Sequence, residues 1–524
     1  MLSAYCDRRF STIYDAAACL LLFFLAIAVA FTYGSYGFTT DETVDHIKAV
    51  RVLSFLSSFG GNRDEITNID KINIYGAMPD VLALLLQKLV PTLSFDSRHL
   101  VSALFGVFGI CYLYRLGRAF ISPAVGFFSA LFLAYNPMWF GYMFLDAKDI
   151  PFAAMLLVAL YYCLTALTGR YKSGWIWLKI GLSIGLFAAT KLIAIPILGF
   201  IGLVALASLI FIPRAVYIQI NRVFFYRLLK ITICAIIGCL VCFTVFWPQF
   251  FFWSPVQLVA IVRFFMNYEP WRGFVQIHGD YIPFDKVPWY YTSTYIIISM
   301  PLFLLALIVA GALCGVIKRE PFVIASTVAC IVIVAYQAIS GVRAWNGYRH
   351  FIFLLPFMML IAAYPIGLIL TLHRSRVVRI ATPIVVLIAM IPTLVSMYQL
   401  FPYQYSFYNI LVGGVPGADG RYYIDVWRSA LREALRKIAD IPNSNDGIHI
   451  YYSCGSTLNF LEHPGFSPAL DVENADYIIV LRRNCDPRTS PVYDLPIVGE
   501  VRRQGVLFAT IYSRQKIRDQ PATR

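Results

Sequence analysis

The chain alternates long apolar runs with short polar stretches over its first 400 residues. A helix needs about 20 mainly apolar residues to cross a membrane, and about eleven runs reach that length once their flanks are included. Since every backbone polar group must be paired inside lipid, such runs predict helices. The fold class expected is an α-helical polytopic membrane protein. The expected spans are 16–31, 99–114, 121–138, 150–168, 175–190, 192–212, 231–247, 291–317, 321–340, 351–371 and 380–399.

Lys and Arg cluster at alternate connections between these runs. Loops on the cytoplasmic side of a membrane carry an excess of Lys and Arg, and all clusters share one side if the N-terminus is cytoplasmic. No small-residue cleavage site follows the first run, so we expect a retained anchor. The clusters lie at 8–9, 115–118, 170–172, 214–230, 318–319 and 374–379.

The remaining polar segments then fall on the extracytoplasmic side. Loop 34–97 is rich in acids and contains two weakly apolar segments, 43–59 and 77–91, which we expect to be interfacial helices. Loop 248–290 is rich in Trp, Phe and Tyr. We expect a transmembrane domain at 1–400 and a small α/β domain at 401–524. The latter has an amphipathic helix at 427–438 and strand-like runs at 448–452, 477–481, 497–502 and 506–512.

Composition supports a membrane protein. Of the 524 residues 59% are hydrophobic and only 14% are charged, which excludes an ordinary soluble protein. The net charge of +14 does not indicate nucleic-acid binding, because the basic residues sit between apolar runs. Nine of the 11 cysteines lie in or beside those runs without metal-ligand spacing, so we expect packing roles. No Asn-x-Ser/Thr site with a non-proline middle residue occurs, which favours a bacterial inner membrane over the secretory pathway.

Several charged residues stand where expected spans meet the extracytoplasmic side. Asp41 and Glu42 follow the first span, and Thr39 with Glu42 also fits a capping box, which is the structural alternative. Charges beside hydrocarbon are costly unless they are paired or functional, and a carboxylate with several cations suits a base acting on an anionic substrate. A lipid-linked sugar phosphate would place its phosphate at this depth, with the aromatic loop over the sugar. The other members of the group are Asp146, Lys148, Asp149, Lys191, Arg349 and His350.

At these positions the chain resembles the GT-C superfamily of integral-membrane glycosyltransferases, specifically bacterial relatives of the protein O-mannosyltransferase and aminoarabinose transferase group. The likeness extends over roughly residues 10–425 and rests on the order of its motifs. These are Thr-Thr-Asp-Glu at 39–42, Leu-Asp-Ala-Lys-Asp-Ile-Pro-Phe at 145–152, Ala-Ala-Thr-Lys-Leu at 188–192, Tyr-Arg-His-Phe-Ile-Phe-Leu-Leu-Pro at 348–356, Pro-Tyr-Gln-Tyr-Ser-Phe-Tyr-Asn at 402–409 and Gly-Gly-Val-Pro-Gly-Ala-Asp-Gly-Arg-Tyr at 413–422.

This resemblance implies an inverting sugar transfer from a polyprenyl-phosphate donor, with Asp41 as the base and Asp149 as the second acidic position. It implies that Lys191 contacts the donor phosphate and that Arg349 lies near it. Members of the superfamily differ in their use of a divalent cation, so Mg²⁺ or Mn²⁺ at Asp41 and Asp149 stays open. Which of Asp146 and Asp149 matters also stays open, as do the sugar and the acceptor, which could be a lipid, a polysaccharide or a protein.

Two other classes of function fit a polytopic protein with charged residues. A transporter or a flippase for lipid-linked sugars is the main alternative, although no internal repeat is visible and the charges favour one face over the midplane. A non-catalytic scaffold for envelope assembly is the other. In every case membrane lipids are partners of the chain.

Cys454 and Cys485 each follow a strand-like run of the C-terminal domain, with a short helical segment at 456–462 between them. A strand, helix and strand in that order favour a parallel crossover, which brings both strand ends to one edge of the sheet. The two thiols are a candidate disulfide if the domain is extracytoplasmic, where the compartment is oxidising. The alternative is that the two cysteines lie apart.

Overall fold

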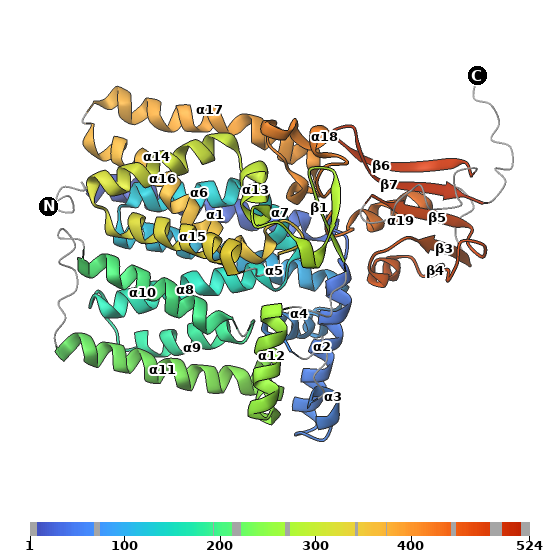
Figure 1. Cartoon of the computed structure of the whole chain (residues 1–524), viewed down its shortest axis with the longest axis horizontal. Coiled ribbons are helices and arrows are strands. Elements are labelled where there is room, and N and C mark those ends of the chain that lie inside the picture. The colour runs from blue at the N-terminus through green and yellow to red at the C-terminus, as the bar shows by residue number, and fades with distance from the viewer. Residues whose placement is uncertain are drawn as a thin grey trace.

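The computed structural model describes residues 8–67, 74–191, 193–211, 222–267, 273–340, 344–373, 375–441, 447–482 and 495–514. A bundle of long helices lies beside a small β-sheet at one end (Figure 1). Each apolar run predicted to span the membrane contains a helix of this bundle. These helices are α1 (Arg8–Thr32), α5 (Ser97–Phe120), α6 (Pro123–Tyr135), α8 (Asp149–Leu167), α9 (Ile176–Ala188), α10 (Ala194–Phe211), α11 (Arg222–Phe246), α14 (Leu302–Lys318), α15 (Pro321–Ser340), α16 (Leu355–Leu372) and α17 (Arg376–Leu400).

The helical membrane fold is confirmed, but the expected number of about eleven spans is not. Within the described residues seven helices are long and apolar enough to cross a membrane, or eight if α13 (Tyr291–Ser299) and α14 form one span bent by 113°. Prolines account for two of the breaks between consecutive helices, because proline lacks the amide proton and favours the first positions of a helix. Pro301 separates α13 from α14, and Pro137 separates α6 from α7 (Pro137–Leu145).

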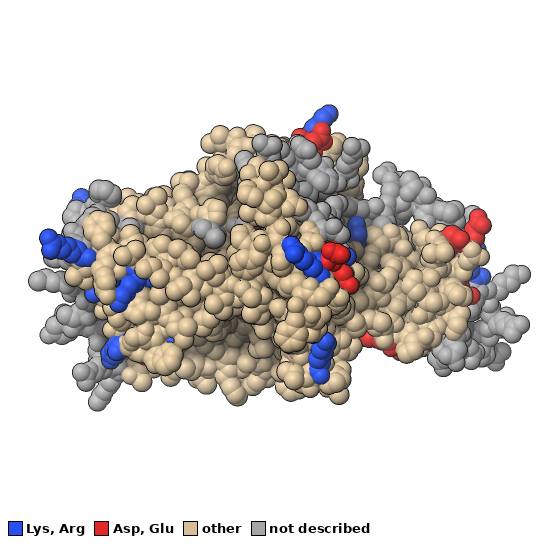
Figure 2. Space-filling view, turned by 90° about the horizontal axis from the view of Figure 1, so that it is seen from below, with Lys and Arg blue, Asp and Glu red and all other residues tan. Residues whose placement is uncertain are grey.

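Burial separates the helices of the bundle into central and peripheral ones. In the most apolar part of Arg349–Leu372, the segment that contains α16, 89% of the residues are buried, compared with 22% in α11 and in α17. The exposed faces of the peripheral helices are apolar, as the side chains of Ile236 and Ile388 illustrate. Figure 2 shows a broad band without charged side chains between the basic end of the bundle and the region nearer the sheet. An apolar belt of this kind is what lipid contact requires.

Shorter helices run across the end of the bundle that is next to the sheet (Figure 1). The two weakly apolar segments predicted to be interfacial helices are both helical, as α2 (Thr40–Ser57) and α4 (Met78–Leu89). Their position at a membrane surface stays a prediction. The other elements at this end are η1 (Tyr33–Ser35), α3 (Arg63–Thr67), η2 (Pro91–Asp96), η3 (Pro248–Phe252), α12 (Pro255–Asn267), β1 (Phe274–Ile277), β2 (Asp280–Pro283), η4 (Phe284–Lys286), η5 (Arg349–Leu354), η6 (Gln404–Ser406), η7 (Ile410–Val412) and α18 (Gly414–Ala418).

The C-terminal part forms a five-stranded sheet in the order β4-β3-β5-β7-β6, with α19 (Ala430–Ala439) packed against it. Asp425 precedes this helix and stabilises its beginning, since its carboxylate accepts from the amides of Ser429 and Ala430, both at 3.0 Å. The predicted small α/β fold is confirmed. The strands are β3 (Ile448–Tyr452), β4 (Phe466–Pro468), β5 (Tyr477–Leu481), β6 (Ile497–Arg503) and β7 (Val506–Ser513), with η8 (Thr457–Glu462) after β3.

The strands β3 and β5 are parallel neighbours, with Ile450 opposite Tyr477. This is the arrangement on which the candidate disulfide depends, and Cys454 lies two residues beyond the end of β3. Cys485 lies outside the described residues, so the bridge itself stays a prediction.

Candidate functional site

Asp41 is the second residue of α2 and lies between two cations. Its Oδ2 accepts from Nη1 of Arg349 at 3.3 Å and lies 3.9 Å from Nζ of Lys148. The side chain of Asp41 is 38% exposed, whereas those of Arg349 and Lys148 are 10% and 18% exposed. Asp41 is therefore an accessible carboxylate with two largely buried cations beside it.

Asp149 begins α8 and forms an ion pair with Lys191, which lies in the short connection between α9 and α10. Both side chains are largely buried, at 6% and 14% exposure. Lys191 also lies over the ring of Phe152, one turn along α8, with Nζ 5.8 Å from the ring centre. The second acidic segment, which includes Asp149, is thus in direct contact with Lys191.

Asp146 differs from Asp149 in its contacts. Its Oδ1 accepts from the backbone amides of Lys148 at 3.2 Å and of Asp149 at 2.9 Å, which closes the turn before α8. Burial raises the pKa of Asp146 well above its usual value, and the nearby carboxylate of Asp149 adds to the rise. Asp146 therefore shapes the turn, while Asp149 faces Lys191.

Arg349 is the first residue of η5, just before α16. Its side chain packs against Trp427 from the C-terminal part of the chain. Its guanidinium carbon lies 4.7 Å from the Trp427 ring centre, which is cation–π contact. Its Nε donates to Nε2 of His350 at 3.5 Å, and the His350 ring packs on Trp345 with 4.3 Å between the ring centres. These contacts hold Arg349 toward Asp41.

Glu42 points away from this group, although it follows Asp41 directly. Its Oε2 accepts from the amide of Thr39 at 2.6 Å, and its Oε1 lies 3.1 Å from Nε2 of His99. The residue is only 1% exposed. The reach-back contact expected of a capping box is present, so the two adjacent acids occupy different environments.

A buried network of charges lies behind Lys148, and the sequence reasoning did not identify it. Lys148 contacts Asp45 at 3.0 Å, Lys48 contacts Asp45 at 3.2 Å and Asp80 at 2.8 Å, and Arg98 contacts Asp80 at 2.6 Å. Burial opposes ionisation of Asp45, but the positive charges of Lys148, Lys48 and Arg98 outweigh it and hold the pKa of Asp45 below its usual value. The signal for this network in the sequence was the spacing of residues 41, 45 and 48, which places them on one face of α2.

Acids at this end of the bundle pair mainly with basic side chains. Asp41 and Asp149 face Arg349, Lys148 and Lys191, and no group of three or more His, Cys, Asp or Glu side chains gathers in the described ranges. This arrangement does not offer the several carboxylate ligands that Mg²⁺ or Mn²⁺ prefers. The positive charges beside Asp41 and Asp149 are those of Arg349, Lys148 and Lys191.

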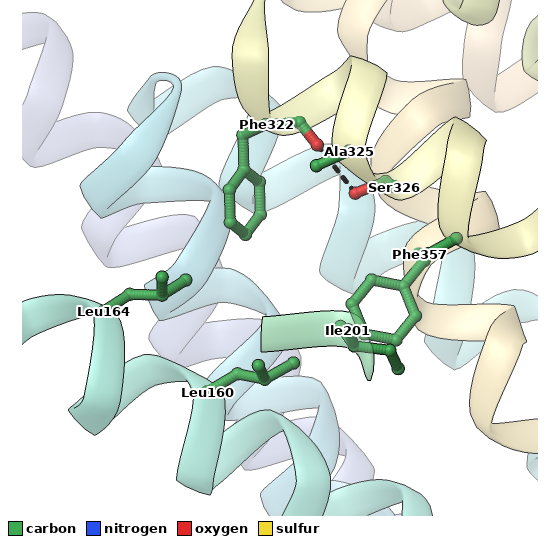
Figure 3. Close-up of a pocket in the computed structure, with 8 residues that line it drawn as sticks. Leu160, Leu164, Ile201, Phe322, Ala325, Ser326 and Phe357 are labelled. Carbon is green, nitrogen blue, oxygen red and sulfur yellow. Dashed lines mark hydrogen bonds between the residues drawn. The ribbon is translucent and has the colours of Figure 1, made fainter. Parts of the chain in front are cut away.

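A separate apolar pocket lies in the bundle between α8, α10, α15 and α16 (Figure 3). Its walls are hydrocarbon except for the hydroxyl of Ser326, which donates to the carbonyl oxygen of Phe322 at 2.8 Å within α15. None of the predicted site residues lines it. The lining residues are Leu160, Leu164, Ile201, Phe322, Ala325, Ser326, Ala329 and Phe357.

Comparison with known proteins gives one family model that matches part of the chain and solved structures of similar fold. Residues 78–250 match the family model described as dolichyl-phosphate-mannose-protein mannosyltransferase. The structure is similar to ArnT from Cupriavidus metallidurans bound to undecaprenyl phosphate, with a TM-score of 0.50, 13% identity, and coverage of 96% of this chain and 97% of that chain. The apo form of that ArnT matches with a TM-score of 0.50 and 14% identity over 94% of this chain and 97% of that chain. A search of curated proteins gave no match.

Proposed function

Because this integral-membrane protein has the fold of the GT-C glycosyltransferases, we propose that it transfers a sugar from a polyprenyl-phosphate donor to an acceptor, with inversion at the sugar. The reaction takes place at the end of the bundle that carries α2 and the sheet, which we assign to the extracytoplasmic face of a bacterial inner membrane. The observation that carries the proposal is an accessible carboxylate, Asp41, beside the buried cations Arg349 and Lys148. The similar ArnT was solved with undecaprenyl phosphate bound, which supports a lipid phosphate as part of the donor.

Asp41 serves as the general base of this reaction. It is more exposed than Asp149, so an acceptor hydroxyl can approach it. Asp41 takes the hydroxyl proton while the acceptor oxygen attacks the anomeric carbon. The bond between that carbon and the phosphate oxygen breaks, and polyprenyl phosphate leaves with the bonding electrons. Attack from the face opposite the leaving group inverts the anomeric centre.

Arg349, Lys148 and Lys191 balance the charge that develops on the leaving phosphate. Without donor, each of them is paired with a carboxylate: Arg349 with Asp41, Lys148 with Asp45 and Lys191 with Asp149. A phosphate that attracts Arg349 weakens its contact with Asp41. This exchange frees the carboxylate oxygen of Asp41 that accepts from Arg349, so that it can accept the hydroxyl proton.

Asp149 and Glu42 support the site instead of taking the proton. Asp149 holds Lys191 in place through a buried ion pair, and Glu42 fixes the start of α2 by accepting from the Thr39 amide. His350 packs between Arg349 and Trp345 and orients the guanidinium.

The proposal is tested by reconstituting the full chain in liposomes with a labelled polyprenyl-phosphate sugar and an extract that contains acceptors. Wild-type protein should release polyprenyl phosphate and label an acceptor, and the product should have the anomeric configuration opposite to that of the donor. Movement of intact donor across the bilayer without release of lipid phosphate would instead establish the alternative, a flippase. Retention of configuration would exclude the single displacement by Asp41.

A further inference from the structure

The loop that leads into α2 is held from its far side by the C-terminal part of the chain. The side chain of Asn459 accepts from the amide of Phe38 at 2.9 Å and donates to its carbonyl oxygen at 3.0 Å. The hydroxyls of Thr43 and Ser456 are 2.8 Å apart. A Cβ at Gly37 would lie 2.0 Å from the carbonyl oxygen of Ser429, so only glycine allows this close approach. The loop that leads into α2 and the C-terminal part of the chain therefore pack as one unit.

Arg432 of α19 is the centre of this contact and is only 2% exposed. Its two terminal nitrogens donate to the two oxygens of Asp96, each at 2.8 Å, and Nη1 also donates to the carbonyl oxygen of Tyr36 at 2.5 Å. The guanidinium lies over the Phe38 ring, 4.8 Å from its centre, and forms an ion pair with Glu462. Paired, parallel contacts of this kind fix both the distance and the plane of the two groups.

From Asp96 a chain of side chains runs to the first turn of α2. Oδ1 of Asp96 lies 3.3 Å from Nδ1 of His99, whose Nε2 lies 3.1 Å from Oε1 of Glu42. The other oxygen of Glu42 accepts from the amide of Thr39 at 2.6 Å, two residues before Asp41. The His99 ring also stacks on Phe38 with 4.9 Å between the ring centres. Each link is buried or largely buried, so the contacts connect Arg432 continuously to the backbone that carries Asp41.

We propose that Arg432 is a positioning residue through which the C-terminal region sets the place of the base Asp41. The inference rests on the proposed function, since it assigns a catalytic meaning to the contact. A displacement of about 1 Å at a reacting group can cost about 10²-fold in rate. Lys cannot reproduce the forked contact with Asp96, because its ammonium is a single point charge.

The test compares Arg432→Lys with wild type in the reconstituted full chain. We expect kcat to fall by about 10- to 100-fold while the donor KM stays within about twofold, since Arg349, Lys148 and Lys191 do not contact Arg432 in this chain of side chains. The matched control is Arg482→Lys, which removes the contacts of two guanidinium nitrogens with Oδ1 of Asp419 (3.0 and 2.9 Å) elsewhere in the C-terminal part and should leave both constants unchanged. An unchanged kcat in Arg432→Lys would overturn the inference.

His99→Gln tests the same chain at its middle. If Arg432 acts through His99, the double variant Arg432→Lys with His99→Gln should lose no more kcat than the more impaired of the two single variants. The reason is that the effects of substitutions at coupled residues are not additive. A double variant whose fold-loss of kcat equals the product of the two single fold-losses would show two independent effects and overturn the inference.

Hydrogen exchange at the amides of residues 39–45 gives a readout without turnover. Exchange should be at least tenfold faster in Arg432→Lys than in wild type or in Arg482→Lys. Equal exchange would overturn the inference whether or not turnover is measured. A wild-type protein that releases no polyprenyl phosphate would overturn the proposed function instead, and with it the catalytic meaning of this contact.

Discussion

Arg349 donates to Asp41 at 3.3 Å, although the two residues lie 308 positions apart in the sequence. The contact brings the start of α2 to the start of η5, and Trp427 from the C-terminal part packs against the guanidinium. Asp41 is 38% exposed and Arg349 is 10% exposed, so the carboxylate is the more accessible member of the pair.

Replacing Asp41 by Asn should abolish most of the transfer activity. Loss of a general base typically lowers the rate by about 10²–10⁴-fold, whereas the amide keeps the size and shape of the side chain. The measurement is kcat for release of polyprenyl phosphate, together with the thermal unfolding midpoint, which should change little. Asp64→Asn, at an exposed acid of α3, is the matched control. Near-normal turnover by Asp41→Asn would leave Asp41 with a helix-dipole role alone.

Glu42→Gln should act differently from Asp41→Asn. Glu42 is 1% exposed and lies 3.1 Å from His99, so the substitution weakens a buried contact more than it removes a proton acceptor. We expect a lower unfolding midpoint with a milder loss of kcat. A loss of kcat as large as that of Asp41→Asn, without any change in unfolding, would assign the base to Glu42.

Lys191→Ala and Arg349→Ala should raise the donor KM, because each removes positive charge from the place of the phosphate. Lys191→Arg should restore donor affinity only in part, since a flat guanidinium differs in shape from an ammonium. The control is Lys318→Ala, at an exposed residue that ends α14. Donor affinity is measured from initial rates over a range of donor concentrations.

Removing Lys191 also leaves the carboxylate of Asp149 buried without its partner. The double variant Lys191→Met with Asp149→Asn removes both charges and should unfold near the wild-type temperature, yet it should keep the raised KM. Normal donor KM in this double variant and in Arg349→Ala would show that both cations serve only as anchors.

Lys48→Met should destabilise the protein without acting on the chemistry directly. Lys48 is 1% exposed and contacts both Asp45 and Asp80, and breaking a buried ion network at one member costs about 3–5 kcal/mol. Lys88→Met, at an exposed lysine of α4, should change the unfolding free energy by less than about 0.5 kcal/mol. Chemical unfolding in detergent compares the two. Equal stability of the two variants would show that Lys148 and Arg98 alone neutralise Asp45 and Asp80.

Cys454 and Cys485 should react with an impermeant alkylating reagent in intact cells only after reduction. This outcome follows if the two thiols form a disulfide and the C-terminal part is extracytoplasmic, where such a bridge typically contributes about 2–4 kcal/mol. Peptide mapping of the alkylated protein identifies the modified positions. Modification of both cysteines without reductant would exclude the bridge, and protection of both from the impermeant reagent after reduction would place them on the cytoplasmic side.

The sequence by itself determined the class of fold and indicated a candidate site. Apolar runs in lipid must form helices, since each unpaired backbone group there costs several kcal/mol, and every expected run does contain a helix. The GT-C resemblance read from the ordered motifs is confirmed at the level of the fold. The structure also brings Asp41, Lys148 and Arg349 together, and Asp149 with Lys191.

Only the tertiary structure decided which charge faces which. Asp41 and Glu42 are neighbours in sequence, yet successive residues of a helix point about 100° apart, so one reaches Arg349 and the other His99. Lys148 contacts Asp45 of α2, and Arg432 of α19 contacts Asp96 of η2, because segments far apart in the sequence meet at one end of the bundle. Local propensity and hydrophobic period carry no information on such pairings, since the energy of an ion pair depends on separation and burial in space and not on distance along the chain.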